Sequence, residues 1–225
     1  MNSMGDQLVA HFFLDTTMAD PFPAEDFDEW AEHYDQSVSN TQSFPFTGYE
    51  DVLDKVVEIA ASHPGMKILD LGIGTGNLAL RFDALGCEIW GTDFSAAMLE
   101  KARPKLPKAH LYQADLRSDW PPELNRHFDR IVSAYVFHHF ELGEKTQIVR
   151  QLVREYLESG GSLIIADIAF QKQRDLEVVK RTVGDEWEDE YYWLADESIT
   201  ALTQIGLRVE YIQVSSCAGI FTLQN

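Results

Sequence analysis

The sequence predicts an α/β protein with a doubly wound, seven-stranded, mostly parallel sheet and helices on both faces. Three observations predict this fold. Apolar strand patterns alternate with helical patterns from Met66 onward, a glycine-rich turn joins the first such strand to the next helix, and the last two strand patterns lie almost adjacent. Alternating strands and helices form parallel sheets, because each helix returns the chain to the edge where the next strand starts.

Two helical patterns precede the first strand. The first pattern has apolar residues at i, i+3, i+4 and i+7, the spacing of one helix face. These residues are Phe27, Trp30, Ala31 and Tyr34. The second pattern covers residues 49–60 and ends before the Pro64-Gly65 pair, which cannot continue a helix.

These patterns divide the chain into a short lead-in and one domain. Residues 1–26 are acidic and contain two prolines, so we expect an N-terminal lead-in there. Residues 27–62 are expected to form a helical lid region and residues 66–225 the core. Together, residues 27–225 then make a single domain.

The core begins with five strand patterns that alternate with helices. Continuous apolar runs such as SLIIADI are typical of central strands that are covered on both faces. The five strands are expected at 66–71, 88–93, 109–115, 128–136 and 162–168. Helices are expected at 77–85, from Ser95 as the N-cap to Arg103 with Pro104 as the stop, at 143–158 and at 196–205.

The last two strand patterns predict a reversal of direction. They cover residues 207–214 and 217–223, and only about two residues separate them. A connection this short joins antiparallel neighbours, because a parallel crossover needs roughly a dozen residues. The sheet is therefore expected to be parallel except for one reversed strand.

Composition and charge favour a small-molecule partner. The chain has 225 residues with 18 basic and 37 acidic side chains, a net charge of −19, and such a field repels phosphate backbones and anionic lipids. No apolar run approaches the roughly 20 residues of a membrane helix, and no basic segment of a secretory signal precedes an apolar run. We therefore expect a cytoplasmic protein with no nucleic-acid and no membrane partner, whose oligomeric state stays open.

A glycine-rich turn follows the first strand and opens the next helix. The run Asp70-Leu71-Gly72-Ile73-Gly74-Thr75-Gly76 presents backbone N–H groups where a ligand can approach. Glycine suits such a turn, because a Cβ atom would block a close approach. The turn therefore predicts a ligand-binding loop.

Further acids end the next two strands. Asp93 lies 21 residues after Gly72 at the end of the second strand, where a carboxylate can accept hydrogen bonds from both hydroxyls of an adenosine ribose. Asp115 ends the third strand, and its side chain or the N–H of Leu116 can reach an adenine edge. Ligands of open α/β sheets bind outside the carboxyl ends of the strands, so these acids predict a nucleoside site.

The motifs together resemble those of class I S-adenosylmethionine-dependent methyltransferases. The resemblance rests on ILDLGIGTGNLAL, GTDFSAAMLEKAR, QADL, FDRIVSAYVFHHF and GGSLIIADI, which occur in the family's order over about residues 27–223. FDEWAEHYD with FPFTGY is similar to a small bacterial group within that family. The resemblance implies strand order 3-2-1-4-5-7-6 with strand 7 reversed, S-adenosylmethionine as cofactor, S-adenosylhomocysteine as product and a small-molecule methyl acceptor.

The resemblance also implies roles for individual residues. Asp70 and Gly72 would face the methionine part and the sulfonium, and Gly74 and Gly76 would shape the loop. Asp93 would bind the ribose. The remaining implied cofactor residues are Phe94 and Met98 beside the adenine, Asp115 and Leu116 at its edge, Ser133 and Ala134 beside the sulfur, and Tyr34 over the cofactor.

Two aromatic side chains suit a cationic sulfonium. Tyr34 and Tyr135 could present aromatic faces to it, since a cation is attracted to the face of an aromatic ring. Tyr34 alone would also fit as an ordinary packed residue of an amphipathic helix.

A histidine pair follows the fourth strand. His138 and His139 are placed at the rim of the expected pocket, and His138 is the candidate catalytic base for an acceptor that must lose a proton. A packing or positioning role is the alternative. The nearest acid, Glu141, is two positions on and no H-E-x-x-H pattern occurs, so no metal site is predicted.

Two other functions fit part of the pattern. An NAD-dependent oxidoreductase also needs a glycine loop and an acid, but Asn77 stands where the third glycine of G-x-G-x-x-G is expected. A non-catalytic S-adenosylmethionine-binding protein would keep every binding motif. The acceptor itself, and whether oxygen, nitrogen, sulfur or carbon is methylated, stays open.

Overall fold

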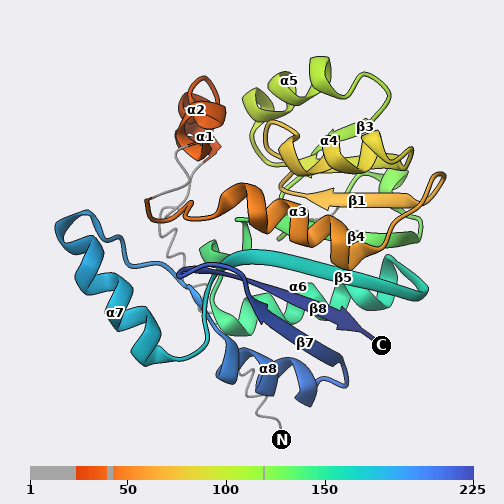
Figure 1. Cartoon of the computed structure of the whole chain (residues 1–225). Coiled ribbons are helices and arrows are strands. Elements are labelled where there is room, and N and C mark those ends of the chain that lie inside the picture. Colours follow the sequence, from red (N-terminus) through yellow and green to blue (C-terminus); the bar gives the residue numbers. More distant parts are fainter. Residues whose placement is uncertain (1–23, 40–42, 119) are drawn as a thin grey trace, which may run out of the picture.

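The computed structural model describes residues 24–39, 43–118 and 120–225, and these form an eight-stranded sheet. The strand order is β3-β2-β1-β4-β5-β8-β7, with β6 paired to β5 (Figure 1). The strands are β1 Lys67–Leu71, β2 Glu88–Asp93, β3 His110–Gln113, β4 Phe128–Ala134, β5 Leu157–Phe170, β6 Trp193–Leu194, β7 Arg208–Gln213 and β8 Ala218–Gln224.

The topology confirms the predicted sheet. Strands β1 to β5 pair in parallel, β8 runs antiparallel to β5, and β7 runs antiparallel to β8. Without the two-residue β6, this is the expected order 3-2-1-4-5-7-6 with the last strand reversed. Four residues, not two, link β7 to β8, and the Val214 N–H closes the connection on the Ala218 carbonyl at 2.9 Å.

Helices cover both faces of the sheet (Figure 1). Side chains alternate across a strand, so Ile68 of β1 packs with the cluster that contains α3, α4 and α5, while Leu69 packs with the cluster that contains α6 and α8. The helices are α1 Ala24–Trp30, α2 Tyr34–Val38, α3 Tyr49–Ala60, α4 Asn77–Ala84, α5 Ala96–Lys105, α6 Leu142–Glu155, α7 Gln173–Val183 and α8 Ala195–Gln204.

The lid region differs from the single predicted helix. A turn at residues 31–33 separates α1 from α2, and the Ser37 side chain stabilises it by accepting from Trp30 Nε1 at 3.3 Å and donating to the His33 carbonyl at 3.1 Å. The helical spacing of the apolar residues persists across this break, so the spacing could not reveal it. Residues 1–23 of the predicted lead-in lie outside the described residues.

Four further elements depart from the sequence prediction. Pro104 lies inside the last turn of α5, and the helix ends one residue beyond it at Lys105. The expected strand at 162–168 is longer, because β5 has an irregular start that includes Gly160 and Gly161, and its register against β4 shifts between Phe128 and Arg130. Helix α7 and strand β6 were not predicted.

Helix α7 carries apolar residues without being buried. Val178 is 53% exposed, and Leu176 and Val179 are only partly buried against the core. Figure 1 shows α7 standing out beside the sheet. No helix in the described ranges is long and apolar enough to cross a membrane.

Candidate functional site

A cavity of about 620 Å³ opens at the carboxyl ends of the parallel strands. The lid helices α1 and α2 and residues 44–46 line one side, and residues 183–192 line the other. Nine predicted cofactor residues line this cavity: Tyr34, Gly72, Gly74, Asp93, Phe94, Met98, Asp115, Leu116 and Ala134. The fold therefore brings together residues from four strand ends and the lid.

The glycine loop is held in a left-handed conformation by its packing. Gly72 has φ +65°, and a Cβ atom there would lie 2.3 Å from Val136 Cγ2. Gly74 has φ +55°, yet a Cβ there would meet nothing within 4 Å. Gly74 thus leaves open space beside the cavity, as a loop that must admit a ligand requires.

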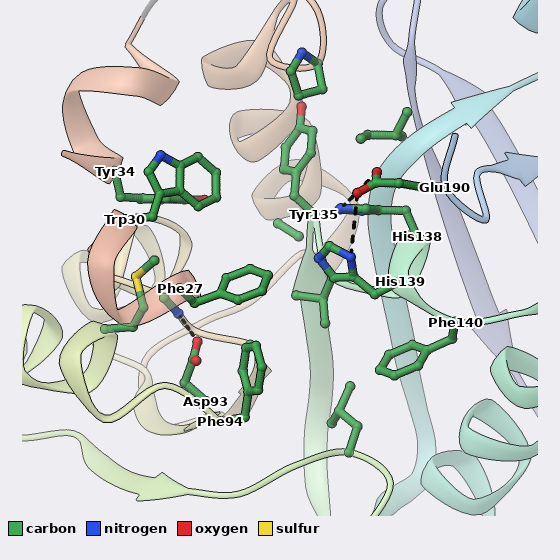
Figure 2. A pocket seen from close by; sticks show the side chains of 18 of the residues that line it. Phe27, Trp30, Tyr34, Asp93, Phe94, Tyr135, His138, His139, Phe140 and Glu190 are labelled. Atoms are coloured by element: carbon green, nitrogen blue, oxygen red, sulfur yellow. Dashed lines mark hydrogen bonds and ion pairs between the residues drawn. The ribbon is translucent and has the colours of Figure 1, made fainter. Parts of the chain in front are cut away.

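Asp93 fixes this loop and faces the cavity. Its Oδ2 accepts the Gly74 N–H at 2.8 Å and its Oδ1 accepts the Ser95 N–H at 2.9 Å (Figure 2). Burial raises the pKa of Asp93 to about 6, although the N–H donors of Ser95 and Gly74 oppose that rise. Each carboxylate oxygen has a second lone pair, so the group can also accept hydrogen bonds from a ligand.

Asp70 is a buried carboxyl group with one orphaned oxygen. It is 2% exposed, and its Oδ2 has no hydrogen-bond partner among the described residues. Burial and then the nearby charge of Asp93 raise the pKa of Asp70 well above its usual range. Asp70 lines a hollow of about 20 Å³ that shares Tyr34, Gly72 and Ala134 with the large cavity. A ligand cation would give this carboxylate the partner that the protein does not supply.

Asp115 is engaged by a residue that the sequence analysis missed. Arg117 donates to it from Nη2 at 2.8 Å and from its own backbone N–H at 2.8 Å, and both side chains line the cavity. The Arg117 guanidinium also lies 5.9 Å from the Phe140 ring centroid. A guanidinium so placed offers a planar surface beside the expected adenine position.

Two predicted cofactor residues line neither the cavity nor the small hollow beside Asp70. Ser133 is fully buried, and its hydroxyl donates to the Leu71 carbonyl at 2.9 Å, so it ties β4 to β1. Gly76 is the N-cap of α4 with φ +92°, and a Cβ there would lie 2.8 Å from Leu106 Cδ1. Both residues therefore support the loop from behind, which a motif alone cannot distinguish from contact with the ligand.

Aromatic rings form most of the lid side of the cavity. Phe27 packs edge-on against Phe94 at 4.8 Å, and Trp30 packs edge-on against Tyr34 at 4.8 Å between ring centroids (Figure 2). Tyr135 continues the aromatic lining from the end of β4, where its φ of +59° is strained for a residue with a side chain. Such strain persists only where packing enforces it, and Tyr135 packs against Phe46 and Tyr49.

His138 lies at the other end of the cavity and is oriented by a buried acid. Its Nδ1 is 2.6 Å from Oδ1 of the fully buried Asp167 at the end of β5. Burial favours the neutral forms of both groups. Their mutual attraction and hydrogen bond, together with Glu190 near His138 and with Lys145 and the Ile168 N–H near Asp167, outweigh burial, so the pKa of His138 is raised and the pKa of Asp167 is lowered. An ionised carboxylate only accepts, so Nδ1 carries the proton and Nε2 faces away from Asp167.

Nε2 of His138 faces Glu190, which arrives from the segment before β6. The distance from Nε2 to Glu190 Oε2 is 3.8 Å, and His139 Nδ1 lies 3.8 Å from Glu190 Oε1 (Figure 2). One ligand atom from each of these three residues lies within 4.8 Å of the others, a spacing that can hold a metal ion. The sequence does not reveal this cluster, because Glu190 lies more than fifty positions after the two histidines along the chain.

Glutamates and aromatic rings form the wall opposite the lid. Glu186, Glu188, Glu190 and Tyr192 line the cavity there, together with Phe44 from the lid side. Residues 170–195 were expected to contribute a substrate wall, although no individual residue was assigned. Asp167 could have been found as the fourth acid, after Asp70, Asp93 and Asp115, at or just beyond a strand end.

The fold and this cavity define a class of protein: a Rossmann-like α/β protein with a glycine-rich loop and a cavity at the carboxyl ends of its parallel strands. Comparison with known sequences agrees. Residues 68–161 match the family model described as a methyltransferase domain. The chain is 34% identical over 203 residues to an "Uncharacterized methyltransferase" of Geobacillus thermodenitrificans, covering 83% of this chain and 89% of the relative.

A second relative and two solved structures extend the comparison. An "Uncharacterized methyltransferase" of Oceanobacillus iheyensis is 30% identical over 210 residues, 88% of this chain and 95% of the relative. The magnesium protoporphyrin IX methyltransferase of Synechocystis with bound S-adenosylhomocysteine has a TM-score of 0.69 at 17% identity, covering 90% and 98%. A DhpI–SAM–HEP complex has a TM-score of 0.67 at 20% identity, covering 89% and 95%.

The chain belongs to the S-adenosylmethionine-dependent methyltransferases. The buried, orphaned carboxylate oxygen of Asp70 and the open space at Gly74 fit this cofactor, which combines a cationic sulfur with a nucleoside.

Proposed function

We propose that this methyltransferase acts on a small molecule that binds between the lid helices and residues 183–192, next to His138. The proposal also covers the domain bounds and the cofactor position. Residues 27–225 form the methyltransferase domain, and the cofactor binds over the glycine loop. The observation that carries the proposal is one continuous cavity joining the loop, Asp93 and the His138 end. Its volume of about 620 Å³ lies in the range of small-molecule sites, roughly 300–1,000 Å³.

The cofactor part of the site follows from the strand ends. Asp93 would bind the ribose hydroxyls, and Asp70 would balance the positive charge of the methionine end. Phe94, Met98 and Leu116 would enclose the adenine. When bound, S-adenosylmethionine supplies a methyl group on a positively charged sulfur. The described residues supply its alignment and the exclusion of water, which is much of what an in-line methyl transfer needs.

The lid helices would exclude water by packing over the loop. Asp28 Oδ1 accepts from the Ser95 hydroxyl at 2.5 Å and from the Ala97 N–H at 3.2 Å. Asp35 accepts from Thr75 at 2.5 Å and from Lys105 at 2.6 Å. These bonds fasten the lid to α5 and to the glycine loop, on both sides of the proposed cofactor position.

The acceptor is proposed to be neutral or cationic before the reaction. Three glutamates line the acceptor side, Glu186, Glu188 and Glu190, and they disfavour an anion there. Where the acceptor must lose a proton, Nε2 of His138 is the proposed base when no cation occupies the site, because Asp167 fixes its Nδ1. The net charge of −19 also supports a small acceptor over a nucleic acid.

The proposal is tested by isotope transfer from labelled S-adenosylmethionine. The purified protein is incubated with the labelled cofactor and a metabolite extract, and labelled products are identified by mass spectrometry. We expect a labelled small molecule that forms with the wild type and forms much more slowly with Asp93→Asn when the labelled cofactor is limiting. Label found only in RNA or protein would contradict a small-molecule acceptor.

A further inference from the structure

Two histidines and a glutamate converge at the acceptor end of the cavity. His138 and His139 belong to the turn after β4, whereas Glu190 belongs to the segment before β6. The glutamate carboxylate spans the two rings, with one oxygen 3.8 Å from each imidazole nitrogen that it faces (Figure 2). These distances exceed those of hydrogen bonds and lie within the range of ion pairs.

A buried acid independently prepares His138 as a ligand. Asp167 accepts from His138 Nδ1 at 2.6 Å, from Trp193 Nε1 at 3.0 Å and from the Ile168 N–H at 2.8 Å. Three donors fix this carboxylate, so it fixes the imidazole in turn. Metal-binding histidines typically donate their other ring N–H to a carboxylate in this way.

The charges around the cluster favour binding of a cation. Asp167 and Glu190 contribute two negative charges, and Lys145 is the cation that acts on Asp167 besides the His138 imidazole itself. Lys145 Nζ donates to the Tyr191 carbonyl and lies 4.4 Å from the Trp193 ring centroid, so it approaches from the core side. One lysine cannot balance both carboxylates, and Glu186 and Glu188 add further negative charge along the same cavity.

We propose that His138, His139 and Glu190 bind one divalent transition-metal ion, of the class that includes zinc, with an open position toward the acceptor. The proposal rests on the proposed function, because it assigns that open position to the methyl acceptor. Two histidines, one glutamate and an exchangeable position are a known ligand set for catalytic zinc. Ligands of tetrahedral zinc lie about 3.3 Å apart. The ligand atoms of these three residues lie within 4.8 Å of one another, so the side chains must move together by up to about 1.5 Å to close on an ion.

Such an ion would select an acceptor with an ionisable hydroxyl or thiol. The bound ion lowers the pKa of an O–H or S–H group at its open position, and the proton leaves to water. The acceptor atom then forms a bond to the methyl carbon, the carbon–sulfur bond of the cofactor breaks, and its electron pair stays on sulfur. Nε2 of His138 cannot hold a proton and an ion together, so the ion would replace the histidine in activating the acceptor.

Metal titration tests the site without knowledge of the acceptor. The protein is dialysed against a chelator, the chelator is removed, and Zn²⁺ is titrated by calorimetry, with Co²⁺ absorption as a second readout. We expect one ion per chain and a visible Co²⁺ spectrum of low coordination number. Asp167→Asn should weaken Zn²⁺ binding about 10- to 100-fold, and His138→Gln and Glu190→Gln should weaken it more.

Two control variants separate the cluster from general acidity. Glu188→Gln removes a neighbouring charge of the same wall, and His127→Gln removes an exposed histidine elsewhere. His127→Gln should bind Zn²⁺ as the wild type does, and Glu188→Gln should weaken Zn²⁺ binding far less than Glu190→Gln does. Affinity for S-adenosylhomocysteine and the melting temperature are measured on every variant, so that misfolding is recognised.

These measurements decide whether Nε2 of His138 binds a metal ion or acts as a base that takes a proton. A wild type that binds S-adenosylhomocysteine but no stoichiometric Zn²⁺ overturns the metal site and leaves the proposed function standing, with His138 as the base. Equal losses of Zn²⁺ affinity in Glu188→Gln and Glu190→Gln also overturn it. Loss of S-adenosylhomocysteine binding in the wild type would instead contradict the proposed function.

Discussion

At the scale of single residues, Asp93 connects the glycine loop to the proposed ribose site. It accepts hydrogen bonds from the Gly74 and Ser95 N–H groups. In Asp93→Asn, the new amide N–H₂ donor would face either one of these N–H donors or a ribose hydroxyl that needs an acceptor. A hydrogen bond to a charged group contributes about 1.5–3 kcal/mol. We expect Asp93→Asn to weaken binding of S-adenosylhomocysteine about 10- to 100-fold, measured by calorimetry.

A matched control keeps this result specific. Asp129 accepts the Lys67 N–H at 2.8 Å at the start of β1, away from the cavity. Asp129→Asn should therefore bind S-adenosylhomocysteine as the wild type does. Equal weakening in both variants would show that the loss comes from the fold and not from ribose recognition.

The raised pKa of Asp93 predicts how cofactor affinity depends on pH. Burial raises this pKa to about 6, and ribose hydroxyls bind the ionised form better, so binding and ionisation favour each other. Affinity for S-adenosylhomocysteine should be constant above about pH 7 and fall by about tenfold per pH unit well below pH 6.

Asp70 and Asp28 also carry charge near Asp93, so the pH profile needs a comparison. Both acids remain in Asp93→Asn, and any slope that survives in this variant belongs to them or to other groups. A variant profile with the full slope of the wild type would remove Asp93 as its source.

Residue types at strand ends revealed about half of the site. Asp70, Asp93, Phe94 and Asp115 lie at or beside the cavities because parallel strands end at one edge, which sequence patterns can show. Glu190 lies more than fifty positions after His138 along the chain, so no local sequence pattern predicts that the two side chains lie close together. Ser133 was predicted to line the pocket, but it is buried behind the glycine loop and bonds to the Leu71 carbonyl. A sequence motif cannot distinguish a residue that supports the loop from one that contacts the ligand.

At the scale of elements, the glycine loop depends on its packing against the turn after β4. A Cβ at Gly72 would lie 2.3 Å from Val136 Cγ2, so the loop or the turn must shift. Gly72→Ala should lower the melting temperature and abolish measurable S-adenosylhomocysteine binding. Val136→Ala added to this variant should restore part of the stability, which thermal unfolding can measure.

A glycine outside the site separates the clash from backbone strain. Gly65 has φ +85°, and a Cβ there meets nothing within 4 Å. Gly65→Ala should cost about 1–2 kcal/mol of stability from left-handed strain and leave cofactor affinity unchanged. If Gly72→Ala behaved like Gly65→Ala, close packing of the loop would not matter for binding.

The lid helices are predicted to hold the cofactor through their side-chain bonds. Asp28 and Asp35 link them to α5 and the loop, and Asp35 is itself partly exposed to solvent. Exposed ion pairs contribute up to about 1 kcal/mol, so Asp35→Asn should weaken S-adenosylhomocysteine binding about two- to fivefold. Calorimetry measures the affinity, and an unchanged value would show that the bonds of the lid helices do not contribute to cofactor binding.

Alternation of strands and helices was enough to predict the elements that build the sheet. The break between α1 and α2 was missed because the apolar spacing continues across it. Helix α1 packs on α5, whereas Val38 of α2 joins the main core. Strand β6 has only two residues, Trp193 and Leu194, and it exists because β5 offers them a partner. Helix α7 has no buried residue, yet Leu176, Val179 and Val183 fall at the spacing of one helix face and could have revealed it.

At the scale of the whole molecule, acidic charge opposes compaction. The net charge of −19 produces self-repulsion in the folded state, and salt screens it over about 10 Å at 0.1 M. The melting temperature should therefore rise by a few degrees when KCl increases from 10 to 200 mM. Choline chloride should act alike, and a falling melting temperature would mean that exposed ion pairs outweigh the repulsion.

The roles proposed for the site residues all depend on where the methyl donor binds. The most direct measurement is a crystal structure of the protein with S-adenosylhomocysteine. We predict ribose hydroxyls within hydrogen-bond distance of Asp93, the adenine beside Phe94 and Leu116, and the sulfur at the Gly72 end of the cavity facing His138. A nucleoside bound elsewhere, or a bound product whose ribose makes no contact with Asp93, would contradict the account.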